Sequence, residues 1–465
     1  MTRRRAIRRS TAIAAGKAVR LASRALGKGG GTALPGLVAT AIYPSIVRDL
    51  THSLEAGAIV VAGTNGKTTT CRLAGSIAQG AGLAPLRNTS GSNLERGLAS
   101  ALVDQMSVLD GENSALLGIF EVDEAALPNV LKSISPRVLV LLDLFRDQLD
   151  RYGEVASVAA AWKLALGSLS PSVTVWVNAD DPLLVEAVAE TPANVRYFGM
   201  DDAPETLGGP DHGGDVKRCP RCGAAIKYEG VFFGHLGNYH CDQCGLTRPE
   251  PVVSARQVVL KGLDGASFVL RAFGEARAIN LKLPGLYNVY NAVAAAAATA
   301  TVGVDLAAIA TGLEATHPAF GRMEHITVND QELILALVKN PTGANAVLRT
   351  IDGAALDLLV LLNDNAADGH DVSWIWDADF ELLSGRLKSV VFSGTRAADM
   401  ALRFKYAGID VSEDAIQVDV DEALGQALRN AGPTGKVLVI PTYTALLQVR
   451  GSLAKSGYVR PYWEA

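Results

Sequence analysis

Short apolar runs alternate with amphipathic stretches between residue 58 and about residue 199. Strand-like runs separated in this way are typical of parallel sheets whose strands are joined by helices. We therefore expect a parallel α/β architecture in this part of the chain. Its predicted strands are residues 58–62, 115–122, 138–144, 173–178 and 195–198.

A second α/β segment begins near Ile326, after Pro318 and Gly321 interrupt the pattern. The alanine-rich stretch 292–300 that precedes this break predicts a packed helix. A chain of 465 residues is long enough for two or three domains. The strands predicted in the second segment are residues 333–338, 355–362, 389–393 and 436–441. We expect an N-terminal segment of residues 1–45, a central domain of residues 46–318 and a C-terminal domain of residues 319–465.

The first predicted strand runs into a glycine-rich turn that opens a helix, Gly-Thr-Asn-Gly-Lys-Thr-Thr-Thr at residues 63–70. Backbone N–H groups and the helix dipole favour phosphate there, Lys67 adds a positive charge, and a hydroxyl can hold Mg²⁺. The usual pattern has a glycine where this chain has Val61, so the loop is a variant that begins at Gly63. A turn without a ligand is the alternative. The predicted nucleoside triphosphate site comprises Gly63, Thr64, Asn65, Gly66, Lys67, Thr68 and Thr69.

Acidic residues stand at the end of the predicted strand 115–122, namely Glu121, Asp123 and Glu124. Carboxylates at the carboxyl end of a sheet strand, close to a phosphate loop, can hold Mg²⁺. A solvated acidic turn is the alternative interpretation.

Four of the five cysteines form two Cys-x-x-Cys pairs, and a glycine follows each pair. Four thiolates at this spacing fit a closed tetrahedral Zn²⁺ site, which leaves no open position for catalysis. Two disulfides or a redox pair are the alternatives. We predict a structural zinc ribbon, inserted at about residues 205–250 and entered through the Gly-, Pro- and Asp-rich segment 201–215. Its ligands are Cys219, Cys222, Cys241 and Cys244.

Charge is unevenly distributed along the chain. The net charge of −5 argues against a general nucleic-acid-binding protein, and no apolar run approaches the length of a transmembrane helix. The first acidic residue is Asp49, whereas the preceding residues contain many arginines with apolar residues between them. This pattern predicts a basic amphipathic helix. A solvated helix, a helix that contacts anionic lipid head groups or a lipid-linked anionic substrate, and an organelle transit peptide are the three interpretations.

Several motifs together resemble the Mur ligase superfamily over the first two-thirds of the chain. They are the loop 63–70, Glu121, Asn-Ala-Asp-Asp-Pro at 178–182, Gly-Leu-Tyr-Asn-Val-Tyr-Asn at 285–291 and Gly-Arg-Met-Glu at 321–324. The resemblance implies ATP and Mg²⁺ as ligands, with Lys67 and Thr68 at the phosphates and metal and Glu121 on the metal. It also implies that Asn291 contacts the adenine and that Arg322 reaches the phosphates from the domain junction. Asp180 and Asn288 join the predicted nucleotide site on the same basis.

Departures from the amino-acid-adding members of that superfamily are equally informative. Their Asp-His-Leu-Asp motif reads Asp-Gln-Leu-Asp here at 147–150, and Trp162 stands where they carry a lysine that becomes carbamylated, with Lys163 one residue out of register. Their Ala-His-Asn-Pro motif reads Val-Lys-Asn-Pro at 338–341. These differences argue against a second Mg²⁺ site of their kind.

The cysteine pairs, the basic N-terminus and the stretch 361–377 resemble one branch, the Mur-ligase-like subunits of lipid II isoglutaminyl synthase. That resemblance implies an ATP-dependent carbon–nitrogen ligase that amidates the α-carboxylate of D-glutamate in the stem peptide of lipid II. It implies a GatD-like class I glutaminase subunit as the partner that supplies ammonia. An aspartate of this chain would complete the partner's Cys-His pair; by motif position it is Asp371, with Asp368 and Asp377 as fallbacks. A capped loop whose tryptophans pack into the core is the alternative for this stretch.

The expected fold is α/β, with a Mur-ligase-type central ATPase domain that carries an inserted Cys₄ zinc ribbon, followed by a smaller Rossmann-like α/β C-terminal domain. We expect a cytoplasmic, non-transmembrane protein that the basic segment can hold at the inner face of the membrane. The first alternative function is a free-standing Mur or folylpolyglutamate-type ligase that adds an amino acid. The second is a non-catalytic nucleotide-binding scaffold whose ribbon recruits a partner.

Overall fold

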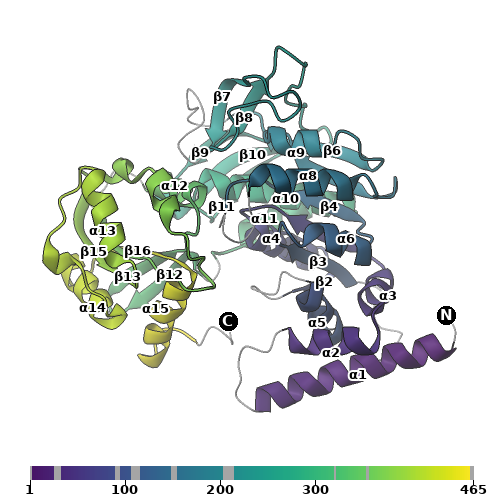
Figure 1. The fold of residues 1–465 in the computed structure, drawn as a ribbon, viewed down its shortest axis with the longest axis horizontal. Helices are drawn as coiled ribbons and strands as arrows, with labels where there is room; N and C mark the ends of the chain where they lie inside the picture. The colour runs from purple at the N-terminus through teal and green to yellow at the C-terminus, as the bar shows by residue number, and fades with distance from the viewer. Residues whose placement is uncertain are drawn as a thin grey trace.

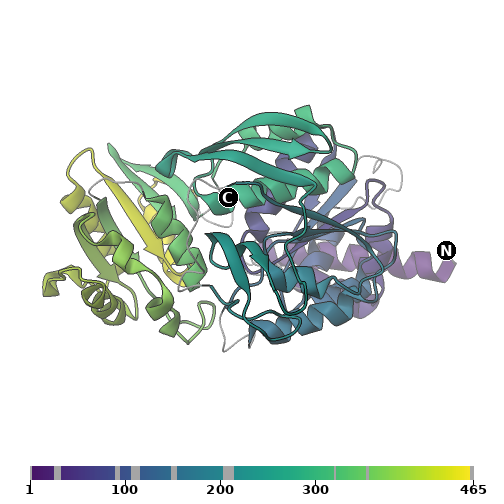
Figure 2. The same cartoon turned by 90° about the horizontal axis from the view of Figure 1, so that it is seen from above.

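A computed structural model describes residues 3–25, 33–88, 95–105, 116–147, 154–202, 214–318, 321–351 and 356–460 of the chain. Two α/β bodies lie side by side, a larger one built from the first two-thirds of the chain and a smaller C-terminal one (Figures 1 and 2). Most of the segment 201–215, which we predicted as the entry to the ribbon, lies outside the described residues.

The larger body is organised around a nine-stranded sheet. The strands from β2 to β6 run parallel, as predicted, and β9 joins β6 in the same direction. Two further strands then extend the sheet with antiparallel pairing. In sheet order the strands are β11 (Glu275–Leu281), β10 (Ala266–Ala272), β9 (Val253–Leu260), β6 (Asn194–Met200), β5 (Thr174–Asn178), β4 (Val138–Leu141), β1 (Ala58–Ala62), β3 (Leu116–Val122) and β2 (Ala84–Arg87).

Helices cover both faces of this sheet because its central strands are apolar on both sides. Val60 points into one core and its neighbours Ile59 and Val61 into the other, as expected for the alternation along a strand. One face is covered by α4 (Lys67–Gly80), α10 (Leu286–Thr301) and α11 (Leu306–Ala315). The other is covered by α3 (Ile46–His52), α5 (Glu95–Gln105), α6 (Leu127–Ser133), α8 (Val155–Leu166) and α9 (Pro182–Ala187).

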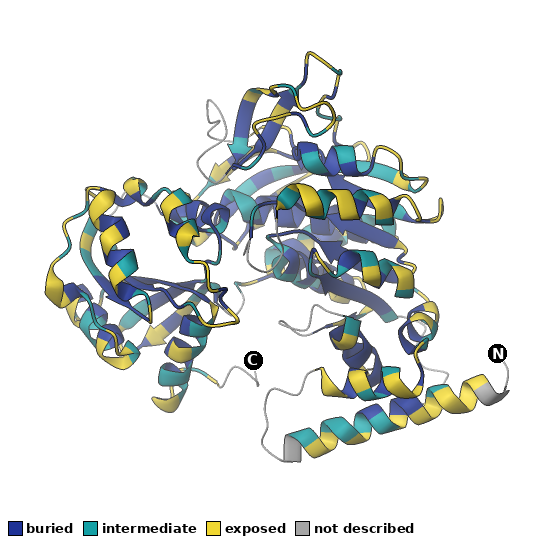
Figure 3. Ribbon diagram, viewed as in Figure 1, coloured by how far each residue is buried: buried dark blue, intermediate teal, exposed yellow. Residues whose placement is uncertain are grey.

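The basic N-terminal segment forms the predicted helix, α1 (Arg3–Ala25), which packs against α2 (Leu34–Ile42) and α5 at the edge of the larger body (Figure 1). Ala12, Ile13 and Gly16 form its buried face. Its opposite face is exposed along the helix (Figure 3) and includes Ile7 and Leu21, which are 58% and 69% exposed. Within the described residues, no helix is both long and apolar enough to cross a bilayer.

The cysteine-rich segment projects from the larger body as an antiparallel hairpin of β7 (Lys227–Phe233) and β8 (Leu236–His240), seen at the top of Figure 1. The first cysteine pair precedes β7 and the second follows β8. The two pairs therefore meet at one end of the hairpin, and its turn lies at the other.

The C-terminal body is a five-stranded sheet with helices on both faces. Its strands in order are β12 (Arg322–Val328), β13 (Gln331–Ala336), β16 (Lys436–Pro441), β14 (Leu356–Leu361) and β15 (Leu387–Ser393), and only β12 is antiparallel to its neighbour. One face packs against α12 (Pro341–Thr350) and α13 (Ala397–Tyr406), the other against α14 (Val420–Ala431) and α15 (Tyr443–Lys455). The short 3₁₀ helices η1 (Gly262–Asp264), η2 (Ser373–Asp377), η3 (Phe380–Leu383) and η4 (Glu413–Ala415) complete the described elements.

Candidate functional site

The phosphate loop joins β1 to α4, as the sequence predicts. Gly66 has φ of 81°, a left-handed conformation that favours glycine. A Cβ at this position would also overlap the Oδ1 atom of Asn291 on α10. The loop therefore passes close to α10, and the N-terminus of α4 lies beside Asn291. The first N–H groups of α4 have no partners within the helix.

Lys67 is buried at the first position of α4 and is surrounded by oxygen atoms. Its Nζ donates hydrogen bonds to the Gly63 carbonyl (2.5 Å) and to Oε2 of Glu124 (3.1 Å), and Oδ1 of Asp123 lies 3.7 Å away. Burial alone would lower the pKa of Lys67, but the charges of Glu124 and Asp123 raise it above its usual value. Lys67 is therefore a fixed positive charge at the predicted phosphate site.

Glu121 stands at the carboxyl end of β3 with its carboxylate buried. Asn88 fixes its backbone through two hydrogen bonds of 3.0 Å. Within the described residues, neither carboxylate oxygen has a hydrogen-bond partner. Burial raises the pKa of Glu121, opposed by the Thr68 hydroxyl and by the charges of Lys67 and Arg322. A buried carboxylate left unpaired beside a phosphate loop fits a divalent cation, for which Thr68 offers a second oxygen.

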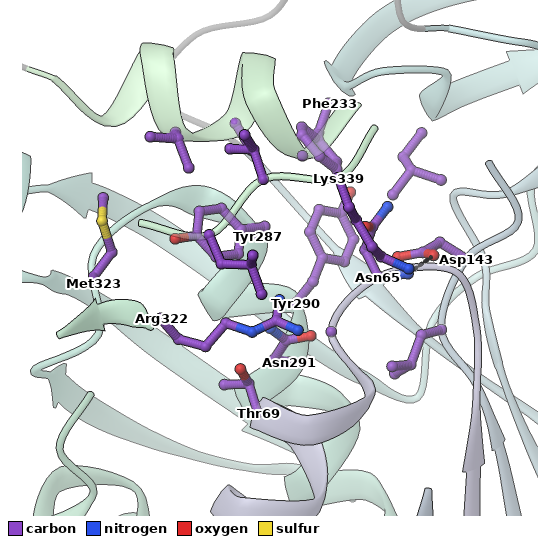
Figure 4. A pocket seen from close by; sticks show the side chains of 18 of the residues that line it. Asn65, Thr69, Asp143, Phe233, Tyr287, Tyr290, Asn291, Arg322, Met323 and Lys339 are labelled. Atoms are coloured by element: carbon purple, nitrogen blue, oxygen red, sulfur yellow. Dashed lines mark hydrogen bonds between the residues drawn. The ribbon is translucent and has the colours of Figure 1, made fainter. Parts of the chain in front are cut away.

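A pocket that is partly open to solvent lies between the phosphate loop, α10 and the C-terminal body. Figure 4 shows Arg322, Asn291 and Thr69 on one side of it, with Phe233 and Lys339 on the opposite side. Its apolar wall includes Phe198, Phe233, Leu236, Tyr287 and Tyr290, and its polar groups include Asn65, Asp143, Asn291, Arg322 and Lys339. Aromatic walls with a few polar groups suit a flat base attached to a charged tail.

The other predicted phosphate-loop residues divide between this pocket and the loop's own framework. Asn65, Gly66 and Thr69 line the pocket, and the Nδ2 atom of Asn65 is buried without a hydrogen-bond partner in the described part of the chain. Thr64 instead exchanges hydrogen bonds with the backbone of Phe145, at 3.0 and 3.2 Å. We therefore expect Thr64 to shape the loop rather than contact the ligand.

Of the more distant predicted residues, Asn291 and Arg322 line the pocket, whereas Asn288 and Asp180 lie behind it. Asn288 accepts a hydrogen bond from Asn291 Nδ2 (3.1 Å) and so orients it. Asp180 is fully buried and accepts a hydrogen bond from the hydroxyl of Tyr290 (2.7 Å). Asp180 thus contacts a residue of the pocket wall but does not line the pocket itself, and its predicted place in the nucleotide site stays a prediction.

The residues that depart from the amino-acid-adding ligases also have defined partners. Lys339 forms an ion pair with the buried carboxylate of Asp147, across the junction between the two bodies. Trp162 is buried and donates a hydrogen bond to the Glu124 carbonyl (2.8 Å). Lys163 pairs with Glu186 and Glu190. An ammonium group thus lies against Asp147 at the junction; Gln148, Leu149 and Asp150 lie outside the described residues.

The four cysteines gather in one cluster, with all sulfur atoms within 4.8 Å of one another. The Cys219–Cys244 and Cys222–Cys241 sulfur distances are 3.5 and 3.6 Å, and none of the four forms a disulfide. Backbone N–H groups of Cys244 and Gln243 lower the pKa of the Cys241 thiol to about 7. Gly223 and Gly245 adopt φ of 75° and 71° after each pair, as tight Cys-x-x-Cys turns require. This cluster can hold a metal ion.

The three aspartates predicted for the partner-facing loop differ in their surroundings. Asp368 is buried and accepts hydrogen bonds from the N–H (2.7 Å) and hydroxyl (2.5 Å) of Thr444. Asp377 pairs with Arg146 at 2.6 Å. Asp371 is exposed, and hydrogen bonds from Ser373 at the start of η2 lower its pKa.

The alternative interpretation of this loop is half right. Asp371 accepts a hydrogen bond from the Ser373 N–H at the start of η2 (2.8 Å), and Trp374 packs against the core of the C-terminal body. Trp376, by contrast, is 48% exposed and packs against the exposed Tyr406, with ring centroids 5.4 Å apart.

Three site residues escaped the sequence analysis. Asp143 follows β4 and accepts a hydrogen bond from the Asn65 N–H (2.8 Å), and burial raises its pKa to about 7. The rule that ligands bind at the carboxyl ends of parallel strands would have found it. Tyr290 belongs to the motif at 285–291, next to the predicted Asn291, and that motif could have indicated it. Phe233 had no such local signal, because the hairpin of β7 and β8 brings it to the pocket.

Comparison with known proteins agrees with this geometry. The Mur ligase middle domain matches residues 61–212, and the MurT ligase C-terminal domain matches residues 337–446. The chain is 24% identical to a pseudomurein peptide ligase type C from Methanothermus fervidus, whose structure superposes with a TM-score of 0.66 over 88% of this chain and 80% of that one. The fold is therefore that of the Mur ligases.

Two curated relatives span nearly the whole length. The lipid II isoglutaminyl synthase (glutamine-hydrolyzing) subunit MurT of Staphylococcus aureus (strain COL) is 32% identical over 97% of this chain and 99% of its own. The subunit of the same name from Streptococcus pneumoniae (strain ATCC BAA-255 / R6) is 34% identical over 93% of this chain and 94% of its own. The chain belongs to the MurT family of the Mur ligase superfamily.

Proposed function

We propose that this chain is the ATP-dependent synthetase subunit of a lipid II isoglutaminyl synthase, which converts the α-carboxylate of D-glutamate in the lipid II stem peptide to an amide. The observation that carries the proposal is a buried phosphate site. Lys67 and the unpaired Glu121 lie at the phosphate loop, beside a pocket that Arg322 lines, in a chain related over nearly its full length to subunits of that name.

A carboxylate needs activation before ammonia can displace one of its oxygens. In the proposed reaction the D-glutamate carboxylate attacks the γ-phosphorus of ATP and releases ADP, and ammonia then attacks the acyl phosphate carbon and releases phosphate. Lys67 and Arg322 would neutralise the charge that builds on the transferring phosphoryl group. Glu121 and Thr68 would hold a Mg²⁺ ion, which would supply further positive charge beside the phosphates.

The ammonia would come from a GatD-like class I glutaminase subunit. Among the three aspartates of the loop, Asp371 is best suited to orient the partner's catalytic histidine, because its carboxylate is exposed. Thr444 engages both oxygens of Asp368, and Arg146 engages Asp377. The exposed Trp376 and Tyr406 beside this loop are residue types favoured in protein interfaces.

The cysteine cluster fits Zn²⁺. Four thiolates at mutual distances of 3.5 to 4.8 Å surround a space suited to tetrahedral Zn–S bonds of about 2.3 Å. Because all four positions would be sulfur, we assign the zinc a structural role. Metal analysis of the purified protein should find zinc, and Cys222→Ser should reduce it; a protein without zinc that retains its fold would refute this assignment.

We also propose that the protein works in the cytoplasm, against the inner face of the membrane that carries lipid II. The exposed face of α1 presents Ile7 and Leu21 between basic residues, which is the pattern of a helix lying at an anionic lipid surface. Deleting α1 would remove the buried residues Ala12 and Ile13 and uncover the surfaces of α2 and α5 against which the helix packs, so a loss of binding could not be separated from a loss of folding. The sharper variant is therefore Ile7→Asp with Leu21→Asp. It should weaken sedimentation with phosphatidylglycerol vesicles, whereas Leu164→Asp, at a 79% exposed site on α8, should not.

The decisive test is ATP turnover with a muropeptide lipid substrate. The chain alone should form the amide when ammonium chloride is supplied, and should use glutamine only when the glutaminase partner is present. Mass spectrometry distinguishes replacement of a carboxylate by an amide from addition of an amino acid. A product that gains an amino acid would establish the free-standing ligase instead, and ATP binding without substrate-dependent turnover would establish the scaffold.

A further inference from the structure

The turn of the ribbon hairpin reaches into the nucleotide pocket. Phe233 ends β7 and Leu236 begins β8, and both side chains line the pocket at 6% and 1% exposure. The other end of the same hairpin, with Tyr239 and Cys241, packs into the core on the opposite face of the sheet. The hairpin therefore connects the metal cluster to the pocket wall.

The turn also packs against the residue that braces the phosphate loop. The ring of Phe145 contacts the rings of Phe233 and His235, with centroids 5.7 and 4.4 Å apart. The backbone of Phe145 both donates to and accepts from the Thr64 hydroxyl. A Cβ on Gly234 would lie 2.6 Å from the Phe145 ring and 3.4 Å from Thr342 of the C-terminal body. The turn is thus confined between the phosphate loop and α12.

Two residues of the cysteine-rich segment form hydrogen bonds to Asp180. The Gly237 N–H donates to its carbonyl (3.0 Å), and Arg248, which follows the second cysteine pair, donates from Nε to its carboxylate (2.5 Å). The same carboxylate accepts the hydroxyl of Tyr290, another wall residue. Displacement of the ribbon would therefore disturb two parts of the wall, the Phe233 turn and the Tyr290 ring.

We propose that the metal-loaded ribbon is a wall of the nucleotide pocket, so that zinc binding and ATP binding strengthen each other. The inference rests on the proposed function for the identity of both ligands. A two-stranded hairpin is at best marginally stable alone, so the metal would hold the turn in place. Without it, nucleotide binding would have to order the turn first. Because coupling between two binding sites is reciprocal, bound nucleotide should retain zinc by the same factor.

The test compares binding of a non-hydrolysable ATP analogue with Mg²⁺ to the zinc-loaded full chain and to the chain stripped by a zinc-selective chelator, by calorimetry. We expect affinity to fall by about 5-fold or more on stripping. In the reverse direction, the analogue should slow zinc release to a chromogenic chelator. Unchanged release would overturn the coupling even if the stripped protein proved unfolded.

A pair of variants localises the effect to the turn. Phe233→Ala should weaken analogue binding while zinc content stays that of the parent. Phe273→Ala is the matched control, since Phe273 is a 49% exposed aromatic residue at the β10–β11 turn, away from the pocket. Equal affinities for the two variants, or for loaded and stripped protein, would overturn the inference and leave the proposed function standing. Failure of every form to bind the analogue would instead overturn the proposed function.

Discussion

Glu121→Gln should stabilise the metal-free protein while abolishing its activity. The carboxylate of Glu121 is buried without a hydrogen-bond partner in the described residues, and a buried unsatisfied polar group costs about 1–3 kcal/mol, more when charged. The charges of Lys67 and Arg322 offset part of this cost. We therefore expect a net gain of about 1 kcal/mol for the neutral amide, which corresponds to a rise of about 1–2 °C in the thermal midpoint of a body of this size.

The stability that Glu121→Gln gains over the parent protein should increase as the pH rises. Burial raises the pKa of Glu121 above its usual value of 4.5. At pH values between 4.5 and the raised pKa, the folded protein therefore binds more protons than the unfolded chain. Stability of the parent protein therefore falls as pH rises through this window. Glu121→Gln removes the titrating group and with it this loss. Its ATP turnover with Mg²⁺ should nevertheless drop by about 100-fold or more, the usual scale for losing a group that stabilises transferring charge.

Glu124→Gln is the matched control, three residues away, and its effect on stability should have the opposite sign. Burial alone would raise the pKa of Glu124, but Lys67 and Lys339 more than offset it and lower the pKa. The pair with Lys67 is buried on both sides, and removing one partner of such a pair costs about 3–5 kcal/mol. The Glu124–Lys67 pair stabilises the protein at pH values above the pKa that Glu124 has in the unfolded chain. This stabilisation is lost as the pH falls through the lower pKa that Glu124 has in the folded protein.

Differential scanning fluorimetry of the two variants across pH 4 to 9, in the presence of EDTA, measures both effects. Lower stability of Glu121→Gln at neutral pH would refute the reasoning, because it would mean that the carboxylate makes net favourable contacts in the folded protein. A rise in stability for both variants would show that burial, and not pairing, dominates at each position.

Other expected outcomes follow from contacts elsewhere in the site. Asp371→Asn should lower glutamine hydrolysis by the assembled complex by up to about 10⁴-fold, with analogue binding intact, and unchanged hydrolysis would exclude its triad role. Lys339→Met should cost about 1–2 kcal/mol in urea unfolding, since it leaves the Asp147 carboxylate unpaired, and the loss should be smaller at pH 5, where a carboxyl whose pKa is raised by burial is more protonated. Arg146→Ala should cost no more than about 1 kcal/mol in urea unfolding, because its ion pair with Asp377 is partly exposed.

Much of the fold could be predicted because its signals are local. The strands predicted at 58–62 and 436–441 coincide with β1 and β16, and the other predicted strands agree within about three residues. The phosphate loop is equally local, since glycines, a lysine and hydroxyls stand next to each other in the chain. By contrast, no prediction covered β9, which joins β6 in parallel, or β10 and β11, which extend the sheet with antiparallel pairing.

The nucleotide pocket could be predicted only in part, because its wall is assembled from distant segments. Asn65 and Asn291 belong to recognisable motifs, whereas Phe233 comes from the ribbon and Lys339 from the loop after β13. Asp180 shows that a motif can identify a residue near the site without indicating what that residue contacts. Its motif marks it as part of the site, yet only the packing of Tyr290 and Arg248 around it shows that it contacts the wall.

Unpaired buried atoms locate this site without reference to any relative. Among the buried side-chain atoms that lack a hydrogen bond in the described residues are Nδ2 of Asn65, both carboxylate oxygens of Glu121 and Nε2 of His235. All four lie at the phosphate loop, beside it or at the ribbon turn. The other atoms of this kind in the described residues lie elsewhere, on Asp104, Tyr239 and Arg450. Leaving a buried carboxylate unpaired lowers stability most, so Glu121 in particular indicates a group kept for a ligand. If so, Mg²⁺ and an ATP analogue together should raise the thermal midpoint more than either alone, since each would satisfy atoms that the other leaves unpaired.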